Sequence, residues 1–102
     1  WRGKGADTYS PFGPWVTTGL DYSNLNLITR VNGDEVQRTN TSELIFDVDT
    51  LVSFISASMT LEPGDAIFTG TSGDTDPMKS GDVTEVELEG CGILSNPIGY
   101  PE

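Results

Sequence analysis

The dipeptide Asn32-Gly33 constrains the fold more than any other feature, because it separates two segments with strand character. The Asn-Gly pair favours a two-residue turn, since both residues tolerate a positive φ. The preceding residues alternate in a period of two, which is typical of a half-buried strand. We therefore predict an antiparallel hairpin with strands at residues 25–31 and 34–39. The alternating sets are Leu25, Leu27, Thr29 and Val31 against Asn24, Asn26, Ile28 and Arg30.

One helix is predicted, over residues 48–59. Asp47 precedes it and is a favoured N-cap residue. Asp49 in the first turn suits the helix dipole. Apolar side chains recur at helical spacing and form a stripe along the helix. They are Leu51, Val52, Phe54, Ile55 and Met59.

The rest of the chain has short strand and turn signals. Residues 1–19 are punctuated by Gly and Pro, which exclude a regular helix there. A short buried strand is predicted at residues 66–69, and two more at 83–89 and 92–95. Turns rich in Gly are predicted at residues 62–65 and 79–82. The predicted fold class is therefore α+β, mainly β, in a single domain over residues 1–102.

The charge balance excludes some partners. Sixteen acidic and five basic residues give a formal net charge of -11. Such a surface repels nucleic acid and anionic membranes, so neither is an expected partner. Its self-repulsion would be screened by salt, which suggests the hypothesis of an origin in a salty, haloarchaeal cytoplasm. The alternative is an ordinary acidic enzyme half whose remaining portion carries compensating lysines.

Cysteine content and hydropathy point to a cytoplasmic protein. The single Cys91 cannot form an internal disulfide, which suits a reducing compartment. The chain has no histidine to activate this thiol, so we interpret Cys91 as a small packed residue. No apolar run approaches the roughly 20 residues of a membrane span, and no signal peptide opens the chain.

Six ordered motifs are spread over nearly the whole chain. They are K-G-A-D-T-Y-S-P-F-G-P-W at residues 4–15, N-G-D-E at 32–35, N-T-S-E-L-I-F at 40–46, L-E-P-G-D-A-I at 61–67, T-G-T-S-G at 69–73 and G-C-G-I-L-S-N-P at 90–97. Together they resemble the motifs of the fumarylacetoacetate hydrolase family. The resemblance implies a partial β-roll with one helix. It also implies that residues 1–102 are the C-terminal half of the family's catalytic domain.

The resemblance assigns roles to four residues. Lys4 would lie beside metal and substrate and stabilise developing negative charge as the catalytic residue. Thr8 would lie near the metal, through its hydroxyl or a bound water. Thr71, with Gly70, would bind the substrate carboxylate. From the residues alone, a solvated Lys4 and a threonine-stabilised turn at Thr71 are the competing interpretations.

The activity implied by the resemblance is metal-dependent hydrolysis of a C–C bond in acylpyruvate- or fumarylpyruvate-like β-diketo acids. The ion would be Mg²⁺, or Mn²⁺ or Ca²⁺, and the active form a homodimer, with Phe12, Pro14 and Trp15 at a subunit contact or over the sheet. The family's carboxylate ligands and its His-Glu pair lie upstream of the Lys4 position. The chain alone is therefore expected to be inactive. The alternatives are an isomerase or decarboxylase of hydroxylated dienoic diacids and a noncatalytic β-rich dimerisation module.

Two acidic clusters are weaker metal candidates. In the strand at residues 83–89, Glu85, Glu87 and Glu89 alternate with Thr84, Val86 and Leu88, so we predict that the glutamates occupy a solvated outer face. The Asp74-Thr75-Asp76 loop offers oxygen ligands but lacks the spacing of an EF-hand.

Overall fold

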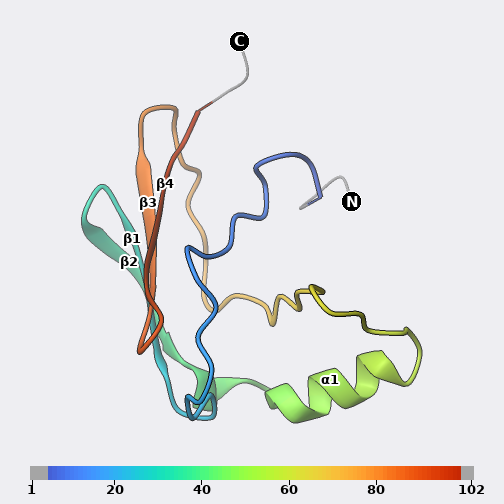
Figure 1. Ribbon diagram of the computed structural model, residues 1–102. Helices are drawn as coiled ribbons and strands as arrows, with labels where there is room; N and C mark the ends of the chain where they lie inside the picture. The colour runs from blue at the N-terminus through green and yellow to red at the C-terminus, as the bar shows by residue number, and fades with distance from the viewer. Residues whose placement is uncertain (1–4, 100–102) are drawn as a thin grey trace.

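The computed structural model describes residues 5–99, which form a four-stranded antiparallel sheet and one α-helix (Figure 1). The strand order is β2-β1-β3-β4, so β1 and β3 are central and β2 and β4 lie at the edges. This agrees with the predicted α+β, mainly β class. The elements are β1 (Asn26–Val31), β2 (Asp34–Asn40), the 3₁₀ helix η1 (Thr41–Glu43), α1 (Val48–Ser56), β3 (Val83–Leu88) and β4 (Gly92–Pro97).

The predicted hairpin is confirmed, with one feature that the sequence did not reveal. Asn32 and Gly33 have φ values of 53° and 88°, as a two-residue turn with two left-handed positions requires. The register then shifts: Thr29 pairs with Gln37, whereas Arg30 pairs with Glu35. Val36 is therefore an extra residue in β2, which is a β-bulge.

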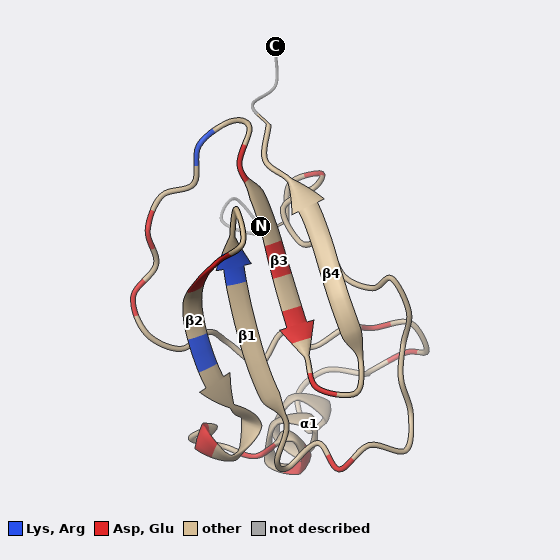
Figure 2. Ribbon diagram, turned by 90° about the vertical axis from the view of Figure 1, so that its left-hand side faces the viewer, with Lys and Arg blue, Asp and Glu red and all other residues tan. Residues whose placement is uncertain are grey.

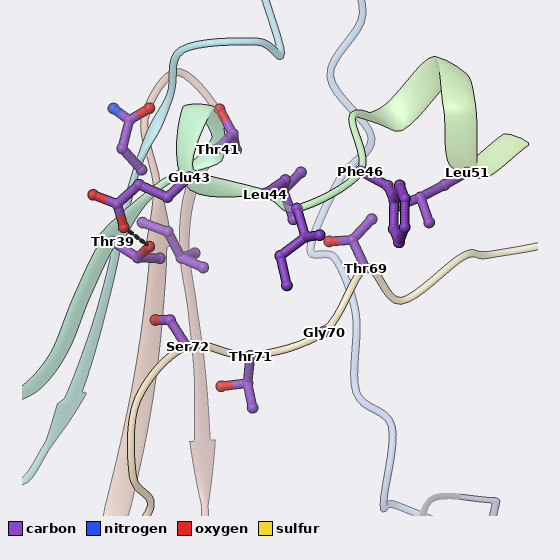
Figure 3. Close-up of a pocket in the computed structure, with 13 residues that line it drawn as sticks. Thr39, Thr41, Glu43, Leu44, Phe46, Leu51, Thr69, Gly70, Thr71 and Ser72 are labelled. Atoms are coloured by element: carbon purple, nitrogen blue, oxygen red, sulfur yellow. Dashed lines mark hydrogen bonds between the residues drawn. The ribbon is translucent and has the colours of Figure 1, made fainter.

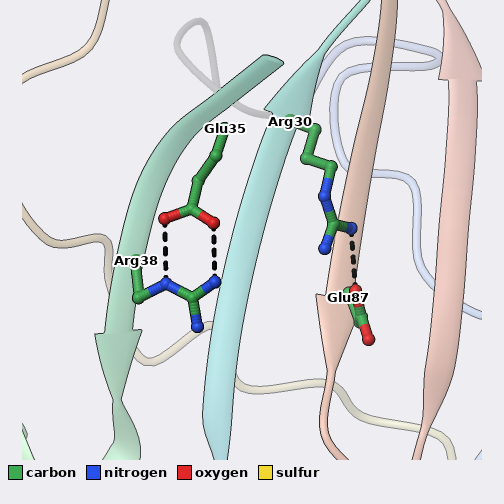
Figure 4. Close-up of polar contacts among 4 residues, drawn as sticks. All are labelled: Arg30, Glu35, Arg38 and Glu87. Carbon is green, nitrogen blue, oxygen red and sulfur yellow. Dashed lines mark hydrogen bonds and ion pairs between the residues drawn. The ribbon is translucent and has the colours of Figure 1, made fainter. Parts of the chain in front are cut away.

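The sheet has two chemically different faces. The inner face faces the loops that cross the sheet, and it consists of Leu27, Thr29, Gln37, Thr39 and Val86. The outer face carries charged residues, whose positions along β1, β2 and β3 are coloured in Figure 2. Its ion pairs join Arg30 to Glu87 at 2.7 Å and Arg38 to Glu35 at 2.6 Å (Figure 4). Glu87 therefore lies on the face opposite Val86, as predicted, where it is paired with Arg30 and only partly exposed.

The helix begins where predicted but ends three residues early. Asp47 Oδ1 accepts a 2.7 Å hydrogen bond from the Thr50 backbone N–H, which makes it the N-cap. After Ser56, the Ser58 N–H donates to the Ile55 carbonyl, a tighter three-residue spacing that ends the α-helix. Figure 1 shows α1 projecting away from the sheet, and the side chains of Val52 and Phe54 are 40% and 76% exposed.

No helix within residues 5–99 combines the length and the apolar character needed to cross a bilayer.

The predicted buried strand at residues 66–69 is wrong. This segment is irregular, and Phe68 within it is 62% exposed. A strand requires a neighbour that pairs its backbone N–H and C=O groups. Within the described residues, none of the four strands forms backbone hydrogen bonds with this segment.

The N-terminal loop crosses the β3–β4 hairpin, and two of its side chains pack directly over glycines of that hairpin. A Cβ atom at Gly90 would lie 2.9 Å from Leu20 Cδ2, and one at Gly92 would lie 2.7 Å from Trp15 Cζ2. Trp15 itself remains 61% exposed and Phe12 67% exposed. The loop therefore covers part of the sheet without enclosing its own aromatic side chains.

The fold leaves an unusually large surface open. Leu25, at 9% exposure, is the one buried hydrophobic residue of the described part of the chain. The total accessible surface is 8284 Å², whereas a compact monomer of 11.0 kDa is expected to expose about 5,600 Å². The excess is roughly 2,700 Å² by this scaling. Many large apolar side chains are therefore exposed, as is typical of a surface that contacts another segment or protein.

Candidate functional site

A cavity of about 440 Å³ opens beside the end of β2. Most of its walls come from the end of β2 with η1, the connection to α1, and the irregular segment after residue 68 (Figure 3), and Leu27 of β1 and Leu51 of α1 complete them. The lining residues are Leu27, Thr39, Asn40, Thr41, Glu43, Leu44, Ile45, Phe46, Leu51, Thr69, Gly70, Thr71 and Ser72.

The cavity has an apolar end and a hydroxyl-bearing end. Figure 3 shows Phe46 and Leu51 together on one side and Thr39 near Ser72 on the other. A pocket with mainly apolar walls and a few placed polar groups is typical of a small-molecule site. Its dimensions and chemistry suit a short molecule with a hydrocarbon part and one polar head.

The hydroxyl-bearing wall depends on glycines for its course. Gly70 and Gly73 have φ values of 110° and 68°. A Cβ atom at either position would meet no atom within 4 Å, so glycine is needed here for backbone conformation rather than for space. The chain therefore turns on both sides of Thr71 and presents it at the cavity.

The opposite wall is a compact network of caps. Asn40 Oδ1 accepts a 2.9 Å hydrogen bond from the Ser42 N–H and so caps η1. Thr41 Oγ1 accepts one of 2.8 Å from the Leu25 N–H. The Thr39 hydroxyl donates to Glu43 Oε2 at 2.7 Å. The polar half of the motif at residues 40–46 thus fixes the wall, while its apolar half lines the cavity.

The structure places two of the four predicted site residues at this cavity. Gly70 and Thr71 line it, whereas Thr8 does not. Thr8 lies in an exposed turn closed by a 3.0 Å hydrogen bond from the Tyr9 N–H to the Ala6 carbonyl. Its φ of 70° is uncommon for a β-branched residue. Lys4 lies outside the described residues.

Sequence reasoning missed Gln37. This residue, together with Gly70, Thr71 and Ser72, lines a second space of about 270 Å³ against the inner face. The bulge at Val36 shifts the register so that the Gln37 side chain lies on the inner face. No local pattern in the sequence predicts that bulge.

Two glutamates of the cluster at residues 85–89 have structural partners, and the described acidic residues do not fit a metal site. Glu87 pairs with Arg30, and Glu89 Oε2 accepts hydrogen bonds of 3.0 and 2.8 Å from Asn26 N and Nδ2. Residues 5–99 contain no group of three or more Asp, Glu, Cys or His side chains that could hold an ion. Because hard divalent cations require several oxygen ligands, the described residues do not supply such a site.

The acidic groups with a lowered pKa lie in a cap, in turns and in the ion pair of β2, and none of them lines the cavity. Hydrogen bonding by the side chain and backbone of Thr50 lowers the pKa of Asp47. The Lys79 N–H, which donates to Asp82 at 2.7 Å, lowers the pKa of Asp82, and Asn32 adds to this effect. These carboxylates stabilise local turns rather than perform acid–base chemistry in the cavity.

Comparison with known proteins agrees with this architecture. Residues 1–99 match the family model described as fumarylacetoacetate (FAA) hydrolase C-terminal. An uncharacterized protein of Archaeoglobus fulgidus is 54% identical over 95 residues, which cover 93% of this chain and 38% of the relative. The chain thus spans about two-fifths of the length of such relatives.

Two solved structures connect the fold to chemistry. The 5-carboxymethyl-2-hydroxymuconate delta-isomerase of Mycobacterium smegmatis superposes with a TM-score of 0.96 at 46% identity, covering 99% of this chain and 40% of that one. Maleylpyruvate hydrolase of Sphingobium sp. SYK-6, in complex with manganese(II) and pyruvate, gives a TM-score of 0.90 at 34% identity, covering 94% and 38%. The chain belongs to the fumarylacetoacetate hydrolase family.

Proposed function

We propose that this chain forms the substrate-binding side of a catalytic domain that hydrolyses a C–C bond in short acylpyruvate- or fumarylpyruvate-like β-diketo acids. The observation that carries the proposal is the cavity whose hydroxyl-bearing wall includes Thr71 between two left-handed glycines. Members of the family include hydrolases, isomerases and decarboxylases. The chain's short length relative to these proteins makes the complete activity a property of a larger assembly.

Three residues would act on the substrate. The Thr71 hydroxyl would donate to its carboxylate, and the turn at Gly70 would let the backbone approach the same group. Lys4 would stabilise negative charge on the enolate. Water adds to the distal carbonyl carbon, the C–C bond breaks, and its electron pair passes to a pyruvate enolate. Protonation of this enolate gives pyruvate beside a carboxylic acid.

A divalent ion is part of the proposal, but its ligands are not among the described residues. A related hydrolase binds manganese(II) together with pyruvate, which supports metal use in the family. Because residues 5–99 do not fit an ion site, we place the ligands of Mg²⁺ or Mn²⁺ in other residues of the assembled domain and assign no step to the ion. We also propose that the assembled protein is a cytoplasmic homodimer.

Isomerisation or decarboxylation of hydroxylated dienoic diacids is the second candidate. It is favoured by identity, which is 46% to the Mycobacterium isomerase and 34% to the maleylpyruvate hydrolase. Both candidates use a substrate with a keto- or enol-acid head, so the carboxylate contact of Thr71 serves either reaction.

The test uses a chimaera, in which the part of the Archaeoglobus fulgidus relative that this chain does not match is joined to residues 1–102. The chimaera is assayed with acylpyruvates, fumarylpyruvate, oxaloacetate and hydroxylated dienoic diacids in Mg²⁺ or Mn²⁺. Loss of the enol absorbance with release of pyruvate supports hydrolysis. Turnover of the diacids alone selects the second candidate.

Matched variants locate the substrate contact. Thr71→Val, which keeps the side-chain shape but loses the hydroxyl, is expected to lower kcat/KM about 10- to 100-fold by loss of one hydrogen bond to a charged group. Thr71→Ser should retain most activity. An inactive chimaera that still forms a stable dimer would instead support a noncatalytic dimerisation module.

A further inference from the structure

The segment that carries Thr71 is held to the sheet by one side chain. Gln37 Nε2 lies 2.8 Å from the Ser72 carbonyl oxygen, 3.3 Å from the Asp74 carbonyl oxygen and 3.5 Å from Thr71 Oγ1. The shortest of these contacts is the principal hydrogen bond, and the two longer ones are weaker. We refer to residues 69–74 as the 69–74 loop.

Other anchors for this loop are scarce. Within residues 5–99, the hydrogen bonds that join the 69–74 loop to the rest of the chain all come from Gln37. The loop contains no helix or strand, and Gly70 and Gly73 lie at left-handed positions within it. A glycine-containing segment without a backbone ladder samples many conformations unless a side chain fixes it.

Gln37 belongs to strand β2, whose backbone is paired with the central strand β1. It pairs with Thr29 of the central strand β1, directly beside the bulge at Val36. The register shift at the bulge places Gln37 on the inner face with Thr29 and Thr39, and Arg38 on the outer face with Glu35. A group on a paired strand can locate a mobile loop more precisely than another loop residue can.

In the contact between Gln37 and Thr71, it matters which group donates and which accepts. A threonine hydroxyl can accept one hydrogen bond and donate another. At 3.5 Å the Gln37 amide makes a weak, long contact as a donor to Thr71 Oγ1, and this contact leaves the hydroxyl hydrogen of Thr71 to donate to a ligand. An anionic carboxylate accepts hydrogen bonds and donates none, so this polarity matches the ligand that the cavity is proposed to take.

We propose that Gln37 is a positioning residue for substrate binding. Its side-chain amide holds the 69–74 loop against the inner face and orients the Thr71 hydroxyl as a donor to the carboxylate of a keto-acid substrate. The inference rests on the proposed function, because its consequence is measured as binding of that substrate.

The test compares two substitutions of Gln37 in the chimaera. Gln37→Met keeps the length of the side chain and removes both donors. Gln37→Glu keeps the shape but places a carboxylate against the carbonyl oxygens of Ser72 and Asp74. We expect each to lower kcat/KM about 10- to 100-fold, mainly through KM, because a displaced binding group weakens a pre-organised contact by this order.

Three further readouts and one control variant separate positioning from general stability. The double variant Gln37→Met/Thr71→Val should be no worse than Thr71→Val alone within about twofold, because both remove the same contact. The ¹⁵N order parameters of residues 71–74 should fall below about 0.6 in Gln37→Met. For Gln37→Glu, KM should recover as the pH is lowered and the carboxyl becomes a donor. Arg38→Met, next in sequence but on the outer face, is the matched control and should leave KM unchanged.

The outcomes distinguish the two proposals. An inactive parent chimaera overturns the proposed function and, with it, the substrate role of Gln37. An active parent whose KM and loop order are unaffected by Gln37→Met overturns the inference about Gln37 alone. Additive losses in the double variant, accompanied by a lower melting temperature, would also overturn it, because they would show that Gln37 supports the fold and not the Thr71 contact.

Discussion

Glu35 and Arg38 are three residues apart in one strand, yet their side chains lie on the same face and form a two-point ion pair. Arg38 Nε donates to Glu35 Oε1 at 2.8 Å, and Arg38 NH2 donates to Oε2 at 2.6 Å (Figure 4). In a regular strand, residues three apart point to opposite faces. The bulge at Val36 removes this opposition and so permits the pair.

Deletion of Val36 should therefore remove the bulge and keep the pair. Glu35 and Arg38 would then be two residues apart in a regular strand and would still share the outer face. The expected result is retention of the slowly exchanging Arg38 Nε–H resonance in the ¹H–¹⁵N spectrum. Glu35→Gln, which removes the charged acceptor and keeps the bulge, is the control and should weaken this resonance. Loss of the resonance after the deletion would contradict the assignment of Val36 as the extra residue.

Substitution of Gly92 should be more damaging than substitution of a comparable glycine elsewhere. Gly81 and Gly92 both have a positive φ, but only at Gly92 would a Cβ atom meet an aromatic ring, that of Trp15. Gly81→Ala should lower the free energy of unfolding by about 1–2 kcal/mol through backbone strain, and Gly92→Ala by a further 1–3 kcal/mol or so through overpacking.

Urea unfolding of the two alanine variants measures this difference, with Trp1→Phe as the background so that fluorescence reports Trp15. Equal losses in both variants would show that Trp15 does not rest on the hairpin.

The N-cap of α1 should lose its stabilising charge in acid. The folded-state pKa of Asp47 is lowered from 3.8, so its contribution to stability is present above that value and is lost as the pH falls through the folded pKa. Asp47→Asn keeps a capping oxygen and Asp47→Ala removes it. We expect the melting temperature to fall in the order wild type, Asn, Ala at pH 7, and the gap between wild type and Asn to close well below pH 3.8. A gap that is constant with pH would refute this assignment.

We expect Thr8 to lower the stability of the fold while contributing to activity. Its left-handed backbone costs on the order of 1 kcal/mol for a β-branched residue. Thr8→Asn, which tolerates this conformation, should raise the free energy of unfolding by up to about 1 kcal/mol while lowering the activity of the chimaera. Thr18→Asn, in the same exposed loop, is the control. If Thr8→Asn left activity intact, the proposed role of the Thr8 hydroxyl would be wrong.

Salt should stabilise the chain. A net charge of -11 destabilises a compact state by self-repulsion, and raising KCl from about 0.01 to 1 M shortens the Debye length from roughly 30 to 3 Å. The melting temperature is therefore expected to rise across this range in a thermal melt followed by circular dichroism. A flat response would remove the hypothesis of a high-salt origin.

Local signals predicted the parts of the fold that depend on neighbouring residues. Asn32-Gly33 determined the hairpin, and Asp47 the start of α1. The segment at residues 66–69 has an apolar pattern but no pairing partner within residues 5–99, and a strand depends on its neighbour. The bulge at Val36 was likewise invisible, because a register shift is a property of two strands.

The candidate site likewise contains residues that the sequence predicted and one that it did not. Gly70 and Thr71 were found from a motif, because the motif is continuous in sequence. Gln37 was missed because its contact with the 69–74 loop spans more than 30 residues and passes through the bulge. The outcome for Lys4 falls outside the described residues.

The sheet order has a consequence for the timing of folding. Strands β1 and β2 are joined by a two-residue turn, but the other central strand, β3, enters the sheet late: Leu27 pairs with Leu88. Such a long-range closure is slow compared with hairpin formation. During synthesis, one edge of β1 would therefore stay unpaired until residue 88 has left the ribosome. In that interval the nascent hairpin offers an open edge, at which it can pair with other chains.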